Sequence, residues 1–282
     1  MPDAARLESF DRDDLRFDVI DQGPLTGPPV VLLHGFPQDS SCWRSVTPLL
    51  NAAGHRTLAP DQRGYSPQAR PLGRGAYRLR ELVDDVIALL DAADIERVHL
   101  VGHDWGGFVA WAVAATYPDR VAAMTVLSTP HPAAFMGSML RGQALRSWYM
   151  AAVQLPVVPE RVLRPGSRVW QSLRQGVGAQ AADEYMQRLS EPGAVTAALN
   201  WYRAMPAEVR HPSIRVGSIA VPTQYVWGEK DPFLGREAAE RTGAYVRGPY
   251  RFRPLPRAGH WLPERHGEQV AQLVLDWSEE VG

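Results

Sequence analysis

The chain alternates between short apolar runs and longer segments with helical spacing. Residues 30–33 are all apolar and follow Gly27-Pro28-Pro29, a pattern typical of a strand buried on both faces. Two further strong runs occupy 98–101 and 121–127, and two weaker runs occupy 15–20 and 56–59. Apolar residues between 79 and 90 recur every three or four positions, and 108–117 is a second, more apolar helical segment. This order predicts parallel strands joined by helices, an α/β fold.

The alternation stops near residue 130. From 131 to 213, prolines and glycines interrupt helical pieces, and no convincing strand is found. Strand patterns resume at 221–227 and 251–255, and a last amphipathic helix begins at Pro263. We therefore expect a sheet domain split into 1–130 and 214–282, with a helical insertion at 131–213.

The composition changes this picture little. The 282 residues are 45% apolar and 22% charged, and 30 basic against 31 acidic residues leave a net charge of -1. This is an ordinary globular composition, and the arginines look scattered along the chain. We therefore expect no nucleic-acid partner.

Neither a signal peptide nor a membrane span is expected. The N-terminus is interrupted by charges, and the longest apolar stretch, 106–117, is shorter than the roughly 20 residues that a span needs. The expected location is the cytoplasm, with no membrane partner, and the protein is expected to be a monomer or a homodimer. Cys42 is the only cysteine, which excludes an intrachain disulfide and a cysteine-rich metal site.

The segment Gly102-His103-Asp104-Trp105-Gly106 lies between a predicted buried strand and a predicted helix. In that context, a central residue flanked by two glycines is typical of a nucleophile elbow, a tight turn that exposes the central side chain. Capping of the following helix is the plainer role for Asp104. The complete pattern favours a nucleophile.

In this architecture the nucleophile, the acid and the base follow in that order along the chain. Asp231 comes at the end of a predicted strand, and His260 lies in a loop before the last helix. A turn aspartate and a surface histidine are the plainer interpretations, but the order predicts that Asp231 orients His260, the base. The backbone N–H groups of Phe36, in an early His-Gly loop, and of Trp105 are predicted to form an oxyanion hole.

These motifs resemble those of the epoxide hydrolases with the α/β-hydrolase fold. The resemblance rests on H-G-F-P, D-Q-R-G-Y-S, G-H-D-W-G-G, D-P and G-H-W at 34–37, 61–66, 102–107, 231–232 and 259–261. It implies that 131–213 is a helical cap, and that Tyr202 and, more loosely, Tyr149 are the pair of tyrosines that assist ring opening. Ser66 and Pro67 depart from the family pattern, which usually has a glycine there, and Arg63 in the same motif is expected to form a structural salt bridge.

An aspartate nucleophile narrows the chemistry to alkyl transfer. A carboxylate that attacks a saturated carbon leaves an ester, which water activated by His260 can cleave. An epoxide also needs an acid for its alkoxide, and a neutral phenol can supply one. We expect an epoxide and water as the reactants and no cofactor or metal. Phe36, Trp105, Tyr149 and Tyr202 are expected to line the substrate pocket.

Two alternatives remain open. A haloalkane or haloacid dehalogenase of the same fold needs N–H donors around the halide and no proton. Phe36 stands where many haloalkane dehalogenases carry a halide-binding Asn, and 127–130 contains no acid, which disfavours this reading. A non-catalytic ligand receptor is the other alternative, and the complete set of nucleophile, acid and base disfavours it.

Overall fold

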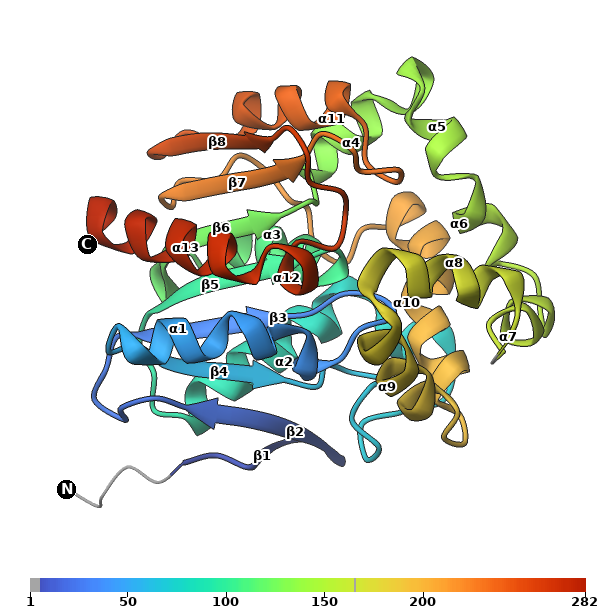
Figure 1. The fold of residues 1–282 in the computed structure, drawn as a ribbon, viewed down its shortest axis with the longest axis horizontal. Coiled ribbons are helices and arrows are strands. Elements are labelled where there is room, and N and C mark those ends of the chain that lie inside the picture. Colours follow the sequence, from blue (N-terminus) through green and yellow to red (C-terminus); the bar gives the residue numbers. More distant parts are fainter. Residues whose placement is uncertain (1–5, 165) are drawn as a thin grey trace.

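The computed structural model describes residues 6–164 and 166–282. Eight strands of the described residues form one sheet, in the order β1-β2-β4-β3-β5-β6-β7-β8 (Figure 1). Their bounds are β1 (Ser9–Arg12), β2 (Leu15–Gln22), β3 (Pro29–Leu33), β4 (Arg56–Pro60), β5 (Val98–His103), β6 (Val121–Leu127), β7 (Thr223–Gly228) and β8 (Tyr250–Leu255). Strands β3 to β8 pair in parallel, and β1 and β2 add an antiparallel edge. The predicted α/β-hydrolase fold, with its mostly parallel sheet, is confirmed.

Helices cover both faces of the sheet. Helices α1 (Thr47–Ala52), α12 (Leu262–Arg265) and α13 (Gly267–Val281) lie in front in Figure 1, and α2 (Leu79–Ala92) and α3 (Trp105–Thr116) lie behind. Alternate residues of β3 therefore enter different cores. Val31 and Leu33 pack in the cluster that contains α2 and α3, whereas Val30 and Leu32 pack in the cluster that contains α13. Burial on both faces is the physical reason for the continuous apolar run.

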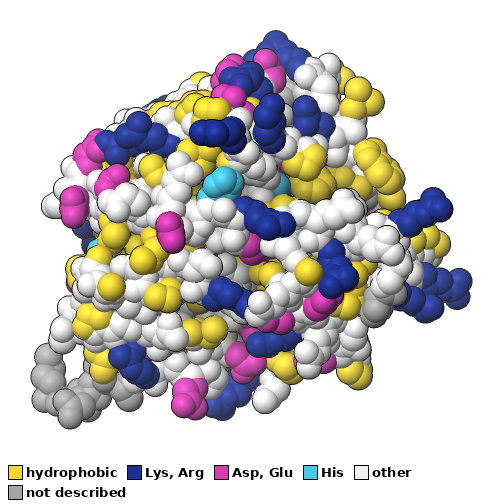
Figure 2. Space-filling model, viewed as in Figure 1, with side chains coloured by type: hydrophobic (Ala, Val, Ile, Leu, Met, Phe, Trp, Pro, Cys, Tyr) yellow, Lys and Arg dark blue, Asp and Glu magenta, His cyan; other side chains and the backbone are white. Residues whose placement is uncertain are grey.

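Helices α4 to α10 lie at the carboxyl ends of the strands (Figure 1). Their bounds are α4 (Pro132–Gly137), α5 (Gln143–Arg146), α6 (Trp148–Ala152), α7 (Val158–Val162), α8 (Arg168–Val177), α9 (Ala179–Leu189) and α10 (Ala194–Arg210). Among them, α4 packs against α11 (Arg236–Arg241) of the sheet domain. Figure 2 shows apolar and basic side chains at the edge of the molecule where these helices lie. Short 3-10 helices occupy Ser40–Ser45, Arg74–Tyr77, Pro118–Arg120, Met139–Arg141 and Thr242–Tyr245.

The structure differs from the sequence prediction at several boundaries. Strand β1 was not predicted, because its four residues include a single apolar side chain, Phe10. The last helix does not begin at Pro263. Pro263 belongs to the short α12, and α13 starts four residues later, because His266 leaves the helical conformation with φ -137° and ψ 32°. In the described residues, no helix combines the length and the apolar character that crossing a membrane requires.

Arg63 forms a buried ion pair beneath the sheet edge. Its guanidinium donates two hydrogen bonds to the carboxylate of Asp85, each 2.7 Å long. Arg12 donates a third bond to Asp85, also at 2.7 Å. Two parallel bonds from a planar guanidinium give strong geometric specificity. The expected structural salt bridge of Arg63 is therefore present.

Candidate active site

Asp104 occupies a strained turn between β5 and α3. Its φ is 51° and its ψ is -120°, which is rare for a residue other than glycine. The turn is possible because the chain comes very close to itself on either side. A Cβ atom on Gly102 would collide with the backbone of Gly106, and one on Gly106 would collide with the carbonyl of Leu33. This tight packing holds the Asp104 side chain at the carboxyl end of the sheet.

The backbone N–H groups of two residues are available near the Asp104 carboxylate, one of them in direct contact with it. The N–H of Phe36, just after β3, donates a 2.8 Å hydrogen bond to Asp104 Oδ1. Trp105 is the first residue of α3, so its N–H is one of the donors that a helix leaves without an internal partner. The two groups are those expected for an oxyanion hole. Oδ1 is therefore the oxygen held by the backbone, and Oδ2 is left for other chemistry.

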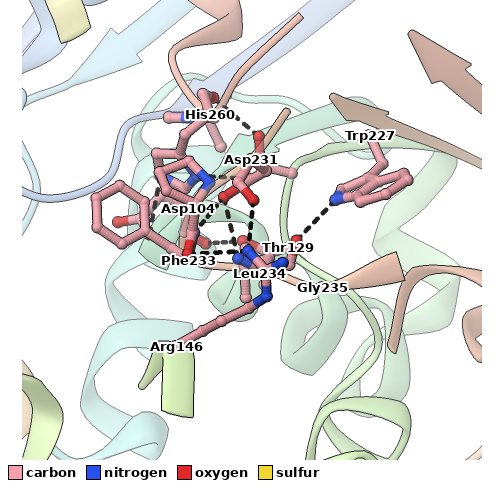
Figure 3. A network of polar contacts seen from close by, with 12 residues as sticks. Asp104, Thr129, Arg146, Trp227, Asp231, Phe233, Leu234, Gly235 and His260 are labelled. Atoms are coloured by element: carbon pink, nitrogen blue, oxygen red, sulfur yellow. Dashed lines mark hydrogen bonds and ion pairs between the residues drawn. The ribbon is translucent and has the colours of Figure 1, made fainter. Parts of the chain in front are cut away.

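His260 lies between two carboxylates (Figure 3). Its Nδ1 is 2.8 Å from Asp231 Oδ2, and its Nε2 is 3.5 Å from Asp104 Oδ2. Oδ1 of Asp231 accepts hydrogen bonds from the N–H groups of Phe233 and Leu234, at 2.8 and 3.0 Å. Asp231 follows β7 and His260 follows β8, so parallel strands bring residues from distant parts of the sequence to one edge.

The charges at the site are strongly coupled. Burial alone would lower the pKa of His260, but the carboxylates of Asp231 and Asp104 outweigh it and raise the pKa to about 10. Burial alone would raise the pKa of Asp104, but the hydrogen bond and charge of His260 hold it below the usual range. At neutral pH, Asp104 is therefore an anion beside a protonated His260.

Several supporting residues escaped the sequence analysis. The hydroxyl of Ser128, after β6, donates to the carbonyl of His260 at 2.9 Å, and the hydroxyl of Thr129 donates to the carbonyl of Asp104 at 2.6 Å. His103 Nε2 lies 2.9 Å from the same His260 carbonyl. These contacts fix the backbone that carries His260 and Asp104. The only local signal was the position of 128–129 at the end of a parallel strand.

Residues of helix α5 form hydrogen bonds with the loop 231–235, which contains Asp231 (Figure 3). Arg146 donates to the carbonyl of Asp231 at 3.1 Å and to that of Pro232 at 3.2 Å. Gln143 donates to the carbonyl of Phe233 at 2.7 Å and accepts from the N–H of Gly235 at 2.9 Å. The helical segment therefore contacts the backbone of the Asp231 loop directly. No sequence pattern marks these two residues.

A cavity of about 390 Å³ opens beside Asp104. Its lining is mostly apolar and includes Trp105, Tyr149 and Tyr202. The two tyrosine rings lie edge to face with centroids 6.1 Å apart, and Tyr202 packs in the same way on Trp105 at 4.9 Å. Burial and the charge of Asp104 raise the pKa of both phenols, so both stay protonated at neutral pH. The cavity thus presents an anionic carboxylate and two neutral phenols.

Phe36 contributes differently from the expectation. Its ring is not part of the cavity lining but packs edge to face on Tyr202, with centroids 5.4 Å apart. Its backbone N–H points to Asp104, while its ring lies against the aromatic cluster. Phe36 therefore reaches the site through its N–H group and supports Tyr202 through its ring.

Comparison with known proteins agrees with this geometry. A family model described as the alpha/beta hydrolase fold matches residues 28–266. Over 98% of both chains, the sequence is 33% identical to the AB hydrolase superfamily protein YfhM of Bacillus subtilis. The chain therefore belongs to the α/β-hydrolase family.

Relatives within this family carry a more specific name. Epoxide hydrolase A of Mycobacterium tuberculosis is 33% identical and is matched over 94% of both chains. Human epoxide hydrolase 4 is 32% identical over 94% of this chain and 76% of its own. The crystal structure of epoxide hydrolase A from Mycobacterium thermoresistibile superposes with a TM-score of 0.83, at 29% identity, over 97% of this chain and 98% of that one. The chain is thus similar to epoxide hydrolases along nearly its whole length.

Proposed function

We propose that this protein is an epoxide hydrolase that converts a small-molecule epoxide and water into a vicinal diol. The observation that carries the proposal is the cavity, in which an ionised aspartate faces two neutral tyrosines. The names of the relatives support the same reaction. Helices α4 to α10 act as a cap that closes the site over the substrate.

The first step is alkylation of Asp104. Because the Phe36 N–H holds Oδ1, Oδ2 attacks an epoxide carbon. A C–O bond forms to Asp104 as the ring C–O bond breaks, and the resulting alkoxide takes a proton from Tyr149 or Tyr202. Protonation by a phenol matters because an alkoxide is a poor leaving group at neutral pH. The product is a hydroxyalkyl ester of Asp104.

The second step is hydrolysis of that ester. Ester formation removes one of the two negative charges that raise the pKa of His260, so the imidazole gives its proton back to the tyrosinate left by the first step and becomes a base. His260 then takes a proton from water, whose oxygen attacks Cγ of Asp104. The charge that develops on Oδ1 is held by the N–H groups of Phe36 and Trp105. Collapse of this intermediate breaks the ester bond to the diol oxygen, which receives the proton from His260.

The tyrosines favour an epoxide over a halide as the leaving group. A halide needs no proton, so a dehalogenase would gain nothing from two buried phenols beside the nucleophile. A receptor would need neither the 2.8 Å contact between His260 and Asp231 nor the strained turn at Asp104. Strain of this kind costs about 1–3 kcal/mol and persists where function requires the geometry.

Trapping the ester tests the proposal. The His260→Gln variant is incubated separately with epoxides and haloalkanes of several sizes, and intact protein and peptides are analysed by mass spectrometry. We expect an adduct of whole-epoxide mass on Asp104. His211→Gln, a change at an exposed histidine, is the matched control and should turn over without an adduct. Asp104→Ala should form no adduct at all.

The other outcomes overturn the proposal in distinct ways. An adduct formed only from haloalkanes, with the halogen lost, identifies a dehalogenase. No adduct from either class, in a variant whose circular dichroism matches that of the wild type, overturns the proposed reaction and favours a ligand receptor or a narrow substrate of another kind.

A further inference from the structure

The positive charge of the chain is concentrated in the helical segment. Residues 132–182 contain six arginines and one acidic residue, Glu160, so this stretch carries +5 while the rest of the chain carries -6. Glu160 is paired with Arg203 of α10 at 2.7 Å. The arginines are spread evenly along the chain, and the local excess of positive charge arises because this stretch contains only one of the 31 acidic residues.

The same stretch exposes most of the large apolar side chains on the surface. Of the thirteen that are exposed in the described residues, nine lie between 136 and 169. They are Met136, Leu140, Leu145, Trp148, Leu155, Val157, Val158, Val162 and Val169. Leu140 is fully exposed, Leu145 is 83% exposed and Trp148 is 70% exposed. Concentrations of this kind mark interaction surfaces, whereas single exposed apolar residues do not.

Basic residues are interspersed with these apolar side chains. Arg161, Arg164 and Arg168 are exposed, and none of them forms an ion pair with another described residue. At the edge where α5, α6 and α7 lie in Figure 1, apolar side chains stand beside projecting basic ones in Figure 2. We call the exposed residues of 136–164 and 166–169 the basic apolar face.

This face is continuous with the substrate cavity. Met136 is 47% exposed and also lines the cavity. On α6, Trp148 points outward while the next two residues, Tyr149 and Met150, line the cavity. One short helix therefore separates the basic apolar face from a tyrosine of the site.

We propose that the basic apolar face docks on an anionic lipid surface. Apolar side chains next to arginines match the acyl and headgroup layers of such a surface. A two-fold dimer through the same face would place like charges against each other. The mostly apolar cavity suits a lipophilic epoxide, which would partition into the lipid and enter beside Met136. This interpretation replaces our expectation of no membrane partner, which relied on the absence of an apolar stretch long enough to span a bilayer.

Vesicle flotation tests the docking without turnover. Purified full-length protein is mixed with vesicles of phosphatidylcholine alone or with about one third phosphatidylglycerol. We expect binding to the anionic vesicles only, and weaker binding as salt rises from about 50 to about 300 mM. The inactive Asp104→Asn variant should bind equally well, so failure of the proposed reaction and failure of docking are distinguishable.

Two sets of substitutions probe the two components of the face. Arg161→Gln/Arg164→Gln/Arg168→Gln should weaken partitioning about 100-fold, since each arginine near an anionic surface contributes about fivefold. Leu140→Ser/Leu145→Ser should weaken it at least about tenfold. The matched controls Leu72→Ser and Arg74→Gln change exposed residues outside the face and should bind like the wild type. Both sets should keep full activity on a water-soluble epoxide.

Three results would overturn the proposal. They are equal binding to neutral and anionic vesicles, substituted proteins that bind like the wild type, and absence of vesicle binding at low salt. If the wild type dimerises without vesicles and Leu140→Ser/Leu145→Ser abolishes the dimer, a second copy of the chain covers the face instead.

Discussion

Asp231→Asn should disable the base by inverting its tautomer. Two N–H donors, from Phe233 and Leu234, face Oδ1 of Asp231, so the amide oxygen of asparagine must take that position. The amide nitrogen then faces Nδ1 of His260 and donates to it. A neutral imidazole in this arrangement carries its proton on Nε2, the atom that faces Asp104. Nε2 can no longer take a proton from water.

The expected size of the effect follows from this geometry. Inversion of the same tautomer in a Ser-His-Asp enzyme lowers turnover about 10⁴-fold, which corresponds to about 5.5 kcal/mol in the barrier. We expect the rate of ester hydrolysis to fall about 10³- to 10⁴-fold. The rate of alkylation should change much less, because the attacking oxygen of Asp104 and the hydrogen bond from the Phe36 N–H to its carboxylate are both unchanged. The ester should therefore accumulate on nearly every molecule during turnover.

Rapid quenching followed by intact-protein mass spectrometry measures both steps. Asp183→Asn is a matched control, since Asp183 is an exposed carboxylate paired with Arg174 and should leave turnover and ester level unchanged. Turnover of Asp231→Asn within tenfold of the wild type, with no ester build-up, would refute the tautomer argument. Loss of turnover without any ester in a folded variant would place Asp231 in the first step instead.

Three further predictions follow from contacts described above. Tyr202→Phe should slow alkylation at least about tenfold while Tyr149 remains as the second acid, and stopped-flow measurement of ester formation checks this; an unchanged rate would remove the role of Tyr202. Arg63→Met should lower the free energy of unfolding by about 3 kcal/mol in urea titrations, because it leaves the buried Asp85 with one cation, and Arg63→Met/Asp85→Leu should recover most of the loss. The raised pKa of His260 stabilises the folded protein fully below about pH 6.5 and no longer above about pH 10. The urea midpoint of the wild type should therefore exceed that of His260→Gln by more at pH 6 than at pH 10. An equal difference at the two pH values would show that His260 is not protonated in the folded protein.

The parts of the fold that could be predicted are those in which a strand is buried on both faces. β3 is wholly apolar, β6 is apolar except for Thr125, and β5 is apolar at three of its first four positions, because both sides of these strands face a core. β1 lies at the edge of the sheet and pairs with β2 alone, so its residues need not be apolar on both faces. The break between α12 and α13 lies at His266, next to the close approach of Gly267 to Ser45, a contact that spacing along the chain cannot reveal.

The candidate site divides in the same way. Asp104, Asp231 and His260 could be proposed because parallel strands bring their carboxyl ends to one edge, so chain order carries spatial information. Gln143 and Arg146 could not, because their partners are backbone carbonyl and N–H groups 85 to 92 residues away, which any sequence would offer. The role of Phe36 was half predictable, since its N–H followed from the loop motif but the direction of its ring depends on Tyr202.

The position of the helical segment between β6 and β7 also has a consequence for synthesis of the chain. Six of the eight strands lie before residue 128, and β7, the partner of the outer edge of β6, begins only at Thr223. A ribosome adding about 5–20 residues per second needs roughly 5–20 s to cover that distance. Throughout that interval β6, whose sequence is almost entirely apolar, has a bare edge that can pair with another nascent chain. Yield in cells should therefore depend on chaperones and on translation speed through the helical segment.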